Sequence, residues 1–408
     1  MEKNAKKLLK ILGKRPVAVF GARMTGIGFC RFAKKHDVNL VTFIDSDSSL
    51  YGKQILGLDI ISPKNLSSLK AKHKNLLLVV AVSIKEDEIT DILKKAGLSA
   101  SDFINYKDFC ENFITIDIVG SCNLKCPSCA NSIETIKRHK GIMPFSDFKK
   151  ILDKVTKESD LVSHICLYNW GEPLLHPEID LIINYAHKKG IAVAVSTNFS
   201  IANTDQVYKT IEASPDIFKV SVSGYYPEVY NTTHTAGDIN LVKSNLYRLK
   251  YFMEKLGSSF PVEVNYHLYK NNTGEDLKKM KELCKELCFI LSTCRANFTP
   301  VERIIDHCQG KTDEKTKEFM KLLPVSVDEG LEMFKQFRNL PCRYLSNQLN
   351  INWDRSVSLC CACYNYPKSV VSKDFLLDSL EDIKNKKKNN DLCKPCIKYG
   401  ANQYLLRI

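Results

Sequence analysis

Between residues 113 and 300 the chain alternates short apolar runs with helix-like stretches, and this alternation restricts the fold more than any other feature of the sequence. Six runs rich in β-branched and aromatic residues are typical of strands, and a helical pattern separates each from the next. The runs are FITIDIVGSC, HICLYNWGEP, IAVAVSTNFS, DIFKVSVSGY, PVEVNYHLY and FILSTCRANFTP. The predicted fold is α/β, an open or partial (β/α)6 barrel with its active site at the carboxyl ends of the strands.

A second strand and helix pattern precedes the barrel. PVAVFGA at 16–22 and VNLVTFID at 38–45 are typical of strands flanking a helix, and further strand and helix signals follow at 76–83 and 86–97. This βαβ pattern predicts a small parallel, Rossmann-like sheet.

The alternation divides the chain into three predicted domains. Residues 1–111 are the Rossmann-like domain, with a boundary near 109–112, and residues 112–305 are the partial barrel. Residues 306–408 begin with a charged helical stretch and end in a cysteine-rich tail, which indicates a metal-stapled third module.

Sixteen of the 408 residues are cysteine, and many stand at short spacings. The N-terminus lacks the apolar core of a signal peptide, and no apolar run approaches the roughly 18 residues of a membrane span. The protein is therefore expected to be cytoplasmic, where clustered cysteines indicate metal or redox chemistry and not disulfides. The net charge of +13 is spread along helical surfaces, so we expect no membrane contact and no nucleic-acid partner.

Three cysteines lie directly after the first barrel strand, in SCNLKCPSCAN. They are Cys122, Cys126 and Cys129. Three thiolates on a cubane of four irons leave one iron with an open coordination position. A zinc or redox site with a distant fourth ligand is the alternative interpretation.

This CxxxCxxC loop after a barrel strand resembles the radical S-adenosylmethionine (radical SAM) superfamily. The resemblance implies a [4Fe-4S] cluster whose open iron binds the amino and carboxylate groups of S-adenosylmethionine (SAM). It also implies a flavodoxin- or ferredoxin-type electron donor and cleavage of SAM to a 5′-deoxyadenosyl radical. At later strand ends it implies five cofactor-binding residues: Gly171, Glu172, Ser196, Asn198 and Ser223.

Two positions differ from the family pattern. Ser128 stands where an aromatic residue usually packs near adenine, and Trp170 replaces the first glycine of the GGEP segment. His176, in LLHPEID, is predicted to introduce or cap the next helix.

The C-terminal cysteines are arranged as one, one and a CxxC pair. This spacing resembles the SPASM/twitch extension in its one-cluster form, and implies an auxiliary [4Fe-4S] cluster on Cys342, Cys360, Cys393 and Cys396. Cys361 and Cys363 leave the identity of the second ligand open.

The remaining cysteines are given other roles. Cys30, Cys110 and Cys166 are expected in the core. MKELCKELC places two cysteines on one helix face, so a further cluster with Cys284, Cys288, Cys294 and Cys308 is an alternative to plain helix packing.

VFGARMTGIG, followed by Asp45 at the end of the second strand, resembles a dinucleotide-binding fingerprint in which Arg23 replaces a glycine. Arg23 argues against ordinary NAD binding. Binding of a nucleotide-sugar, binding of a protein partner and a purely structural role all stay open for this domain.

The sequence thus predicts an enzyme of oxidoreductase type that cleaves SAM reductively and abstracts a hydrogen atom from its substrate. A sugar or nucleotide-sugar in glycan or natural-product biosynthesis is favoured, with oxidation or epimerisation as the outcome. A peptide-modifying maturase is the alternative, and a non-catalytic iron–sulfur electron carrier or scaffold is the alternative from another class. RNA modification is supported by charge alone.

Overall fold

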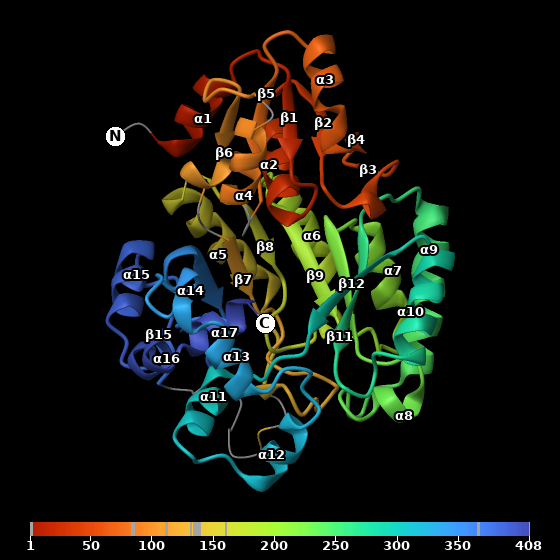
Figure 1. The fold of residues 1–408 in the computed structure, drawn as a ribbon, viewed down its shortest axis with the longest axis vertical. Coiled ribbons are helices and arrows are strands. Elements are labelled where there is room, and N and C mark those ends of the chain that lie inside the picture. The colour runs from red at the N-terminus through yellow and green to blue at the C-terminus, as the bar shows by residue number, and fades with distance from the viewer. Residues whose placement is uncertain are drawn as a thin grey trace.

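The computed structural model describes residues 3–82, 86–95, 97–110, 113–130, 133, 140–159, 161–364 and 368–407. The predicted boundary at 111 and 112 lies outside these residues. The described strands form a six-stranded sheet, in the order β3-β4-β2-β1-β5-β6, and a nine-stranded sheet, in the order β12-β11-β10-β9-β8-β7-β13-β14-β15. Figure 1 shows the smaller sheet, with its helices, stacked on one end of the larger one.

Residues 3–110, here called the N-terminal layer, contain the smaller sheet. Its strands are parallel except for β3, which pairs antiparallel with β4. The strands are β1 (Val17–Phe20), β2 (Leu40–Ile44), β3 (Gln54–Ile55), β4 (Leu58–Ile61), β5 (Leu77–Val80) and β6 (Phe103–Asn105). The helices are α1 (Asn4–Leu12), α2 (Met24–Lys35), α3 (Leu66–Lys72) and α4 (Glu86–Lys95).

The six predicted barrel strands are all present and lie side by side in chain order, each parallel to the next. They are β7 (Phe113–Ile116), β8 (His164–Cys166), β9 (Ala192–Thr197), β10 (Ile217–Val222), β11 (Val262–Leu268) and β12 (Ile290–Arg295). The intervening helices are α5 (Phe145–Glu158), α6 (Ile179–Lys188), α7 (Thr204–Glu212), α8 (Pro227–Tyr230), α9 (Ile239–Leu256) and α10 (Glu275–Glu286). The α/β partial barrel is therefore confirmed.

Residues 301–407, here called the C-terminal module, continue the barrel sheet. β13 pairs parallel with β7, and the hairpin partners β14 and β15 follow antiparallel. The elements are α11 (Val301–Cys308), α12 (Glu314–Met320), α13 (Val327–Met333), α14 (Arg343–Asn347), β13 (Gln348–Ile351), β14 (Val357–Ser358), β15 (Val370–Ser372), α15 (Leu380–Lys388), α16 (Cys393–Tyr399) and α17 (Ala401–Arg407).

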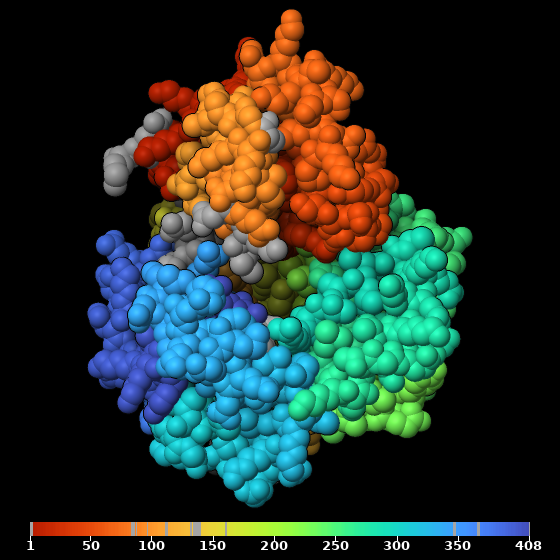
Figure 2. Space-filling model, viewed as in Figure 1, coloured from red at the N-terminus to blue at the C-terminus, as the bar shows by residue number. Residues whose placement is uncertain are grey.

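Short 3₁₀ turns complete the described elements: η1 (Ser48–Leu50), η2 (Pro63–Asn65), η3 (Tyr106–Asp108), η5 (Pro173–Leu175) and η6 (Lys335–Phe337). Within the described ranges, no helix combines the length and the apolar character that a membrane span needs. Figure 2 shows the surface hollowed between the N-terminal layer, the blue C-terminal module and the teal segment that contains β12.

The N-terminal layer packs on the amino ends of the barrel strands. The first residues of three strands, Ala192, Ile217 and Ile290, belong to the same buried cluster as the apolar face of α2. Gly28 of α2 lies so close that a Cβ there would stand 2.0 Å from the carbonyl oxygen of Ser163. The division into three domains stays a prediction, and the first two predicted domains share one core.

Candidate functional site

The three-cysteine loop follows β7 and crosses the carboxyl end of the barrel. Cys122, Cys126 and Cys129 are all partly exposed, and the backbone N–H of Cys129 donates to the carbonyl of Cys126 over 2.9 Å. Burial of the thiols raises the pKa of Cys122 to about 12 and that of Cys126 well above its usual value. Without metal these two thiols are neutral at pH 7, so binding of iron must displace their protons.

Both ends of the loop are supported from elsewhere in the chain. The N–H of Gly120 donates to the carbonyl of Gly141 over 2.8 Å. The ring of Trp353, from the β13–β14 turn, packs against both glycines, and a Cβ at either would stand 2.1 Å from it. Between the second and third cysteines, Arg303 of α11 donates to the carbonyl of Pro127 over 2.7 Å. The C-terminal module therefore helps to shape the loop.

Glu172 lies after β8 and its side chain is almost completely buried. Its carboxylate accepts hydrogen bonds from the hydroxyl of Thr197 (2.6 Å) and from the backbone N–H groups of Asn198 (2.8 Å) and Leu174 (3.0 Å). Burial raises its pKa to about 7, against the effect of these donors. A carboxylate has about four acceptor positions, so one is left for the cofactor that Glu172 is predicted to bind.

Gly171 can only be glycine at this position. A Cβ there would lie 1.6 Å from the carbonyl oxygen of Val119. The carboxylate of Asp117 accepts the N–H groups of both Trp170 (3.2 Å) and Gly171 (3.1 Å). The departure at Trp170 has a structural use, because its ring packs edge-on against Tyr364 of the C-terminal module, with ring centroids 5.4 Å apart.

Asn198, at the end of β9, joins the strand ends to the cysteine loop. Its amide nitrogen contacts the sulfur of Cys122 (3.6 Å) and donates to the side-chain oxygen of Asn123 (2.9 Å). Its backbone N–H is one of the donors to Glu172. The structure thus brings together three of the predicted site residues, Cys122, Glu172 and Asn198. Ser196 lies two residues earlier on the same strand and is partly buried.

Ser223 lies in a different, fully buried environment. Its hydroxyl contacts Thr233 and lies 2.5 Å from Nδ1 of His234. Burial lowers the pKa of His234 to about 3, so this histidine is neutral. The predicted contact between Ser223 and SAM stays a prediction, since the hydroxyl is engaged inside the protein.

The donor set fits an iron–sulfur cluster. In the described part of the chain, no three His, Cys, Asp or Glu side chains converge as the ligands of one metal ion would. A four-iron cluster does not need such convergence, because each cysteine binds a different iron. Three thiolates are the ligand set of a cluster with one open iron, so the donors of the loop fit such a cluster.

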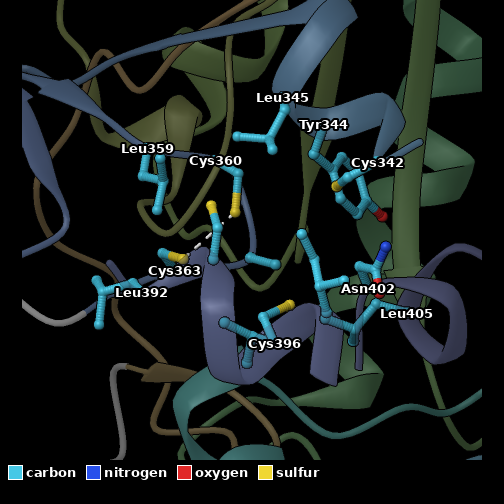
Figure 3. A pocket seen from close by; sticks show the side chains of 14 residues that line it. Cys342, Tyr344, Leu345, Leu359, Cys360, Cys363, Leu392, Cys396, Asn402 and Leu405 are labelled. Carbon is cyan, nitrogen blue, oxygen red and sulfur yellow. Dashed lines mark hydrogen bonds between the residues drawn. The ribbon is translucent and has the colours of Figure 1, made fainter. Parts of the chain in front are cut away.

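The C-terminal cysteines line one pocket, enclosed otherwise by mostly apolar side chains. Figure 3 shows Cys360, Cys363 and Cys396 around the same space, with Cys342 close by. All four predicted auxiliary ligands are among the lining residues: Cys342, Cys360, Cys393 and Cys396. Thiols from α16 and from the segments before α14 and after β14 thus meet at one place, as an auxiliary cluster would require.

This pocket bears on which of Cys360, Cys361 and Cys363 is the second ligand of the auxiliary cluster. Cys360 and Cys363 line it, and their sulfur atoms lie 3.4 Å apart. The hydrogen bond between the two sulfur atoms holds the pKa of Cys360 below its usual value and raises that of Cys363. Cys361 instead has its backbone N–H directed at Gln348 (3.3 Å) and is not among the lining residues.

The other cysteines do not gather around a site. Cys30, Cys110 and Cys166 are buried, as predicted. Cys284 belongs to the barrel core, whereas Cys288 is exposed and lies beyond the end of α10 at Glu286. The prediction that these two share a helix face was wrong, because the helix ends first.

The dinucleotide-like fingerprint of the N-terminal layer is occupied by internal contacts. Arg23 forms ion pairs with Asp47 (2.8 Å) and with Glu263 of β11 (3.3 Å). Asp45 accepts the N–H groups of Ala22 (2.7 Å) and Asp47 (2.9 Å). Both fingerprint residues therefore make contacts within the protein, and the choice among a nucleotide-sugar, a protein partner and a structural role stays a prediction.

His176 is structural, as predicted. Its side chain is buried, with Nε2 2.7 Å from the carbonyl oxygen of Met143, while Nδ1 accepts the N–H of Glu178 over 3.0 Å. Sequence reasoning missed Asp117 and Thr197, which fix the GEP segment. A carboxylate inside the apolar run ITIDIVG was a signal for Asp117, whereas Thr197 had none.

Residues 116–284 match the family model described as the radical SAM superfamily. The tungsten-containing aldehyde ferredoxin oxidoreductase cofactor-modifying protein of Pyrococcus furiosus is 27% identical over 184 residues, which cover 43% of this chain and 48% of the relative. The AdoMet-dependent heme synthase of Methanosarcina barkeri is 25% identical over 174 residues, covering 43% of this chain and 47% of the relative. The chain thus spans about half the length of these curated relatives.

Among solved structures, SuiB of Streptococcus suis bound to S-adenosylmethionine superposes with a TM-score of 0.47 at 14% identity. The superposition covers 80% of this chain and 72% of SuiB.

Proposed function

Because this chain carries a radical SAM domain at residues 116–284, we propose that it cleaves SAM reductively and uses the 5′-deoxyadenosyl radical to abstract a hydrogen atom from a substrate. Cys122, Cys126 and Cys129 would hold a [4Fe-4S] cluster, which supplies the electron and an open iron for SAM. The observation that supports this most is the connection of the cysteine loop to the ends of β8 and β9 through Asn198.

The residues at these strand ends would position SAM. Glu172 keeps one carboxylate position for an ammonium group, and its burial makes that interaction stronger than it would be in water. The absence of a side chain at Gly171 lets its backbone lie against the carbonyl of Val119, just before the cysteine loop. A flavodoxin- or ferredoxin-type protein is the proposed electron donor.

Cys342, Cys360, Cys393 and Cys396 would hold the auxiliary cluster, which supplies an electron acceptor near the substrate. The edge-on contact between Trp170, which follows β8, and Tyr364 joins the barrel to the C-terminal module. An acceptor of electrons favours oxidation of the substrate over redox-neutral epimerisation.

We favour a sugar or nucleotide-sugar as the substrate, from the polar residues of β11 and β12. Val262, Val264 and Tyr266 pack in the helix-facing core, so the residues between them lie on the opposite face of the strand. On that face, Nδ2 of Asn265 lies 3.2 Å from Nε2 of His267. The S–H of Cys294 donates to the side-chain oxygen of Asn265 over 3.4 Å.

These groups are neutral donors and acceptors. Burial lowers the pKa of His267 to about 4, so it carries no charge at pH 7. Neutral hydrogen-bonding groups suit the hydroxyl groups of a sugar, the part that a free sugar and a nucleotide-sugar share. The names of the two curated relatives also concern small molecules, a cofactor and heme, and not peptides.

The experiment is anaerobic turnover of the reconstituted full chain with dithionite and SAM, analysed by mass spectrometry. We expect 5′-deoxyadenosine from the wild type and none from Cys126→Ala. Cys288→Ala is the matched control, because this exposed cysteine lies outside the proposed sites. Equal and negligible 5′-deoxyadenosine from wild type and Cys126→Ala would leave only the electron carrier or scaffold.

A substrate panel then separates the two enzyme proposals. Sugars and nucleotide-sugars are incubated in parallel with short peptides, and each product is searched for the loss of two hydrogen atoms. Loss from a peptide alone would replace the sugar proposal by the maturase. A steep salt-dependent affinity for tRNA would instead favour RNA modification.

A further inference from the structure

Lys387, on α15, is one of the most deeply buried charged residues of the described chain, with 1% of its surface exposed. Its ammonium donates to the backbone carbonyls of Tyr344 (3.0 Å) and Gln348 (2.5 Å). The two neighbouring lysines, Lys386 and Lys388, are exposed. A buried ammonium costs several kcal/mol unless another charge compensates it.

No carboxylate compensates this charge. Among the ion pairs of the described residues, none includes Lys387, whereas Lys386 pairs with Asp378 over 2.7 Å. Burial lowers the pKa of Lys387. Its acceptor Tyr344 is among the residues that line the pocket of the auxiliary cysteines, so the ammonium lies close to that pocket. Neutral thiols add no negative charge, so among the described residues the ammonium has no ion-pair partner.

An iron–sulfur cluster held by four thiolates supplies that negative charge. Four thiolates carry −4 and an oxidised [4Fe-4S] core carries +2, so the complex has a net charge of −2 and gains a further negative charge on reduction. A positive charge nearby stabilises the reduced form more than the oxidised form. Net charge around a cluster is one of the factors that set its reduction potential.

We infer that Lys387 is the built-in counter-charge of the auxiliary cluster and makes that cluster easier to reduce. This inference rests on the proposed function. It identifies a residue outside the cysteine motif that adapts the site to accept an electron. Lys387 is a positioning and tuning residue, since it donates to the carbonyl of Tyr344, which lines the cysteine pocket, and does not line the pocket itself.

A merely structural role is the competing explanation. Lys387 donates to the carbonyl of Tyr344, in α14, and to that of Gln348, the first residue of β13. These two elements form the segment that links Cys342 to the hairpin. Such a role predicts that substitution lowers stability or cluster content. It predicts no change in the potential of a cluster that still binds.

The test is potentiometric titration of the auxiliary cluster, followed by electron paramagnetic resonance. The full chain is reconstituted in a Cys122→Ala, Cys126→Ala, Cys129→Ala background, so that only the auxiliary cluster contributes. We compare Lys387→Gln, which keeps a donor without the charge, with Lys387→Arg, which keeps the charge. Lys386→Gln is the matched control on the same helix.

We expect Lys387→Gln to make the potential more negative by at least a tenfold change in the reduction equilibrium, about 59 mV for one electron. Lys387→Arg and Lys386→Gln should stay close to the parent protein. An unchanged potential in Lys387→Gln, at equal iron content, would overturn the inference. If Lys387→Gln binds no iron, Lys387→Met is titrated in its place, and either the parent potential or a second loss of iron overturns the inference.

The two proposals fail separately. Formation of 5′-deoxyadenosine by wild type, together with an unchanged potential in Lys387→Gln, overturns the role of Lys387 and leaves the enzyme proposal standing. A shifted potential in a protein that never forms 5′-deoxyadenosine supports the role of Lys387 and overturns the enzyme proposal.

Discussion

Two buried carboxylates organise the carboxyl ends of β7, β8 and β9. Asp117 accepts hydrogen bonds from the two backbone N–H groups that precede Glu172. Glu172 accepts one from the N–H of Asn198, at the end of β9. Charged acceptors make stronger hydrogen bonds than neutral ones, so each carboxylate fixes several backbone groups at once. The positions of Gly171 and Asn198 are therefore set before any ligand binds.

Replacing Gly171 by alanine should destabilise the protein by about 1–3 kcal/mol, because the added Cβ would overlap the carbonyl of Val119. Anaerobic urea denaturation of the metal-free chain measures the effect. The control is Gly274→Ala, since a Cβ there meets nothing within 4 Å. Equal stabilities of the two variants would contradict the close approach.

His164 predicts a pH dependence of stability. Its imidazole is buried at the start of β8 and stacks on Phe113, and burial lowers its pKa from 6.5 to about 4. Between pH 6.5 and pH 4 the imidazole is mostly protonated in the unfolded chain and mostly neutral in the folded chain. Stability from this residue is therefore complete above pH 6.5 and is lost as the pH falls towards 4, by roughly 3 kcal/mol.

The measurement compares the free energy of unfolding at pH 7 and pH 5 for wild type and His164→Gln. Glutamine does not titrate, so the variant should lose less stability on acidification. His36→Gln, at an exposed position, should keep the wild-type slope. An identical slope in His164→Gln would show that His164 contributes nothing to acid sensitivity.

At the scale of elements, α2 is the helix that joins the two sheets. Arg31 on its barrel-facing side reaches Asp216, before β10, with 2.5 Å between Nε and Oδ1. The side chain of Asp216 is fully buried and also accepts the N–H of Val193 and contacts His187, each at 2.9 Å. One carboxylate thus ties a helix of the N-terminal layer to two barrel strands.

Arg31→Met should therefore cost about 1.5–3 kcal/mol of stability, the range for a hydrogen bond to a buried charged group. The exposed pair of Lys189 and Asp153 provides the control, since Lys189→Met should cost no more than about 1 kcal/mol. The measurement is the free energy of unfolding of both variants, from denaturation under the same conditions. A loss no larger for Arg31→Met than for Lys189→Met would mean that the ion pair does not hold the layers together.

The elements themselves were largely predictable from sequence. The six barrel strands are short apolar runs with regular spacing, so periodicity found each one. The cysteine loop and the Glu172 segment were found because they directly follow such strands. Trp353, Lys387 and the pairing of Arg23 with Glu263 were not predictable, because each joins segments far apart in the chain and none has a local pattern.

At the scale of the whole molecule, the shared core predicts one cooperative unfolding transition for the N-terminal layer and the barrel. The first residues of β9, β10 and β12 are buried against the layer and cannot stay buried without it. Both tryptophans of the chain lie outside the layer, at positions 170 and 353, so their fluorescence reports on the other modules.

Unfolding in guanidinium is followed by tryptophan fluorescence and by hydrogen exchange of peptides from residues 3–110. We expect the two midpoints to coincide. Separate midpoints, with the N-terminal peptides exchanging first, would show that the layer unfolds on its own and would favour the three predicted domains as independent units.

The contact of Trp353 with Gly120 and Gly141 has a consequence for how the protein is made. More than two hundred residues are synthesised between the cysteine loop and the ring that packs against it. On the ribosome, the loop emerges long before its support exists. We therefore expect iron to be inserted into the released, complete chain, and a nascent chain that stops before β13 to hold its three cysteines without the shape that retains a cluster.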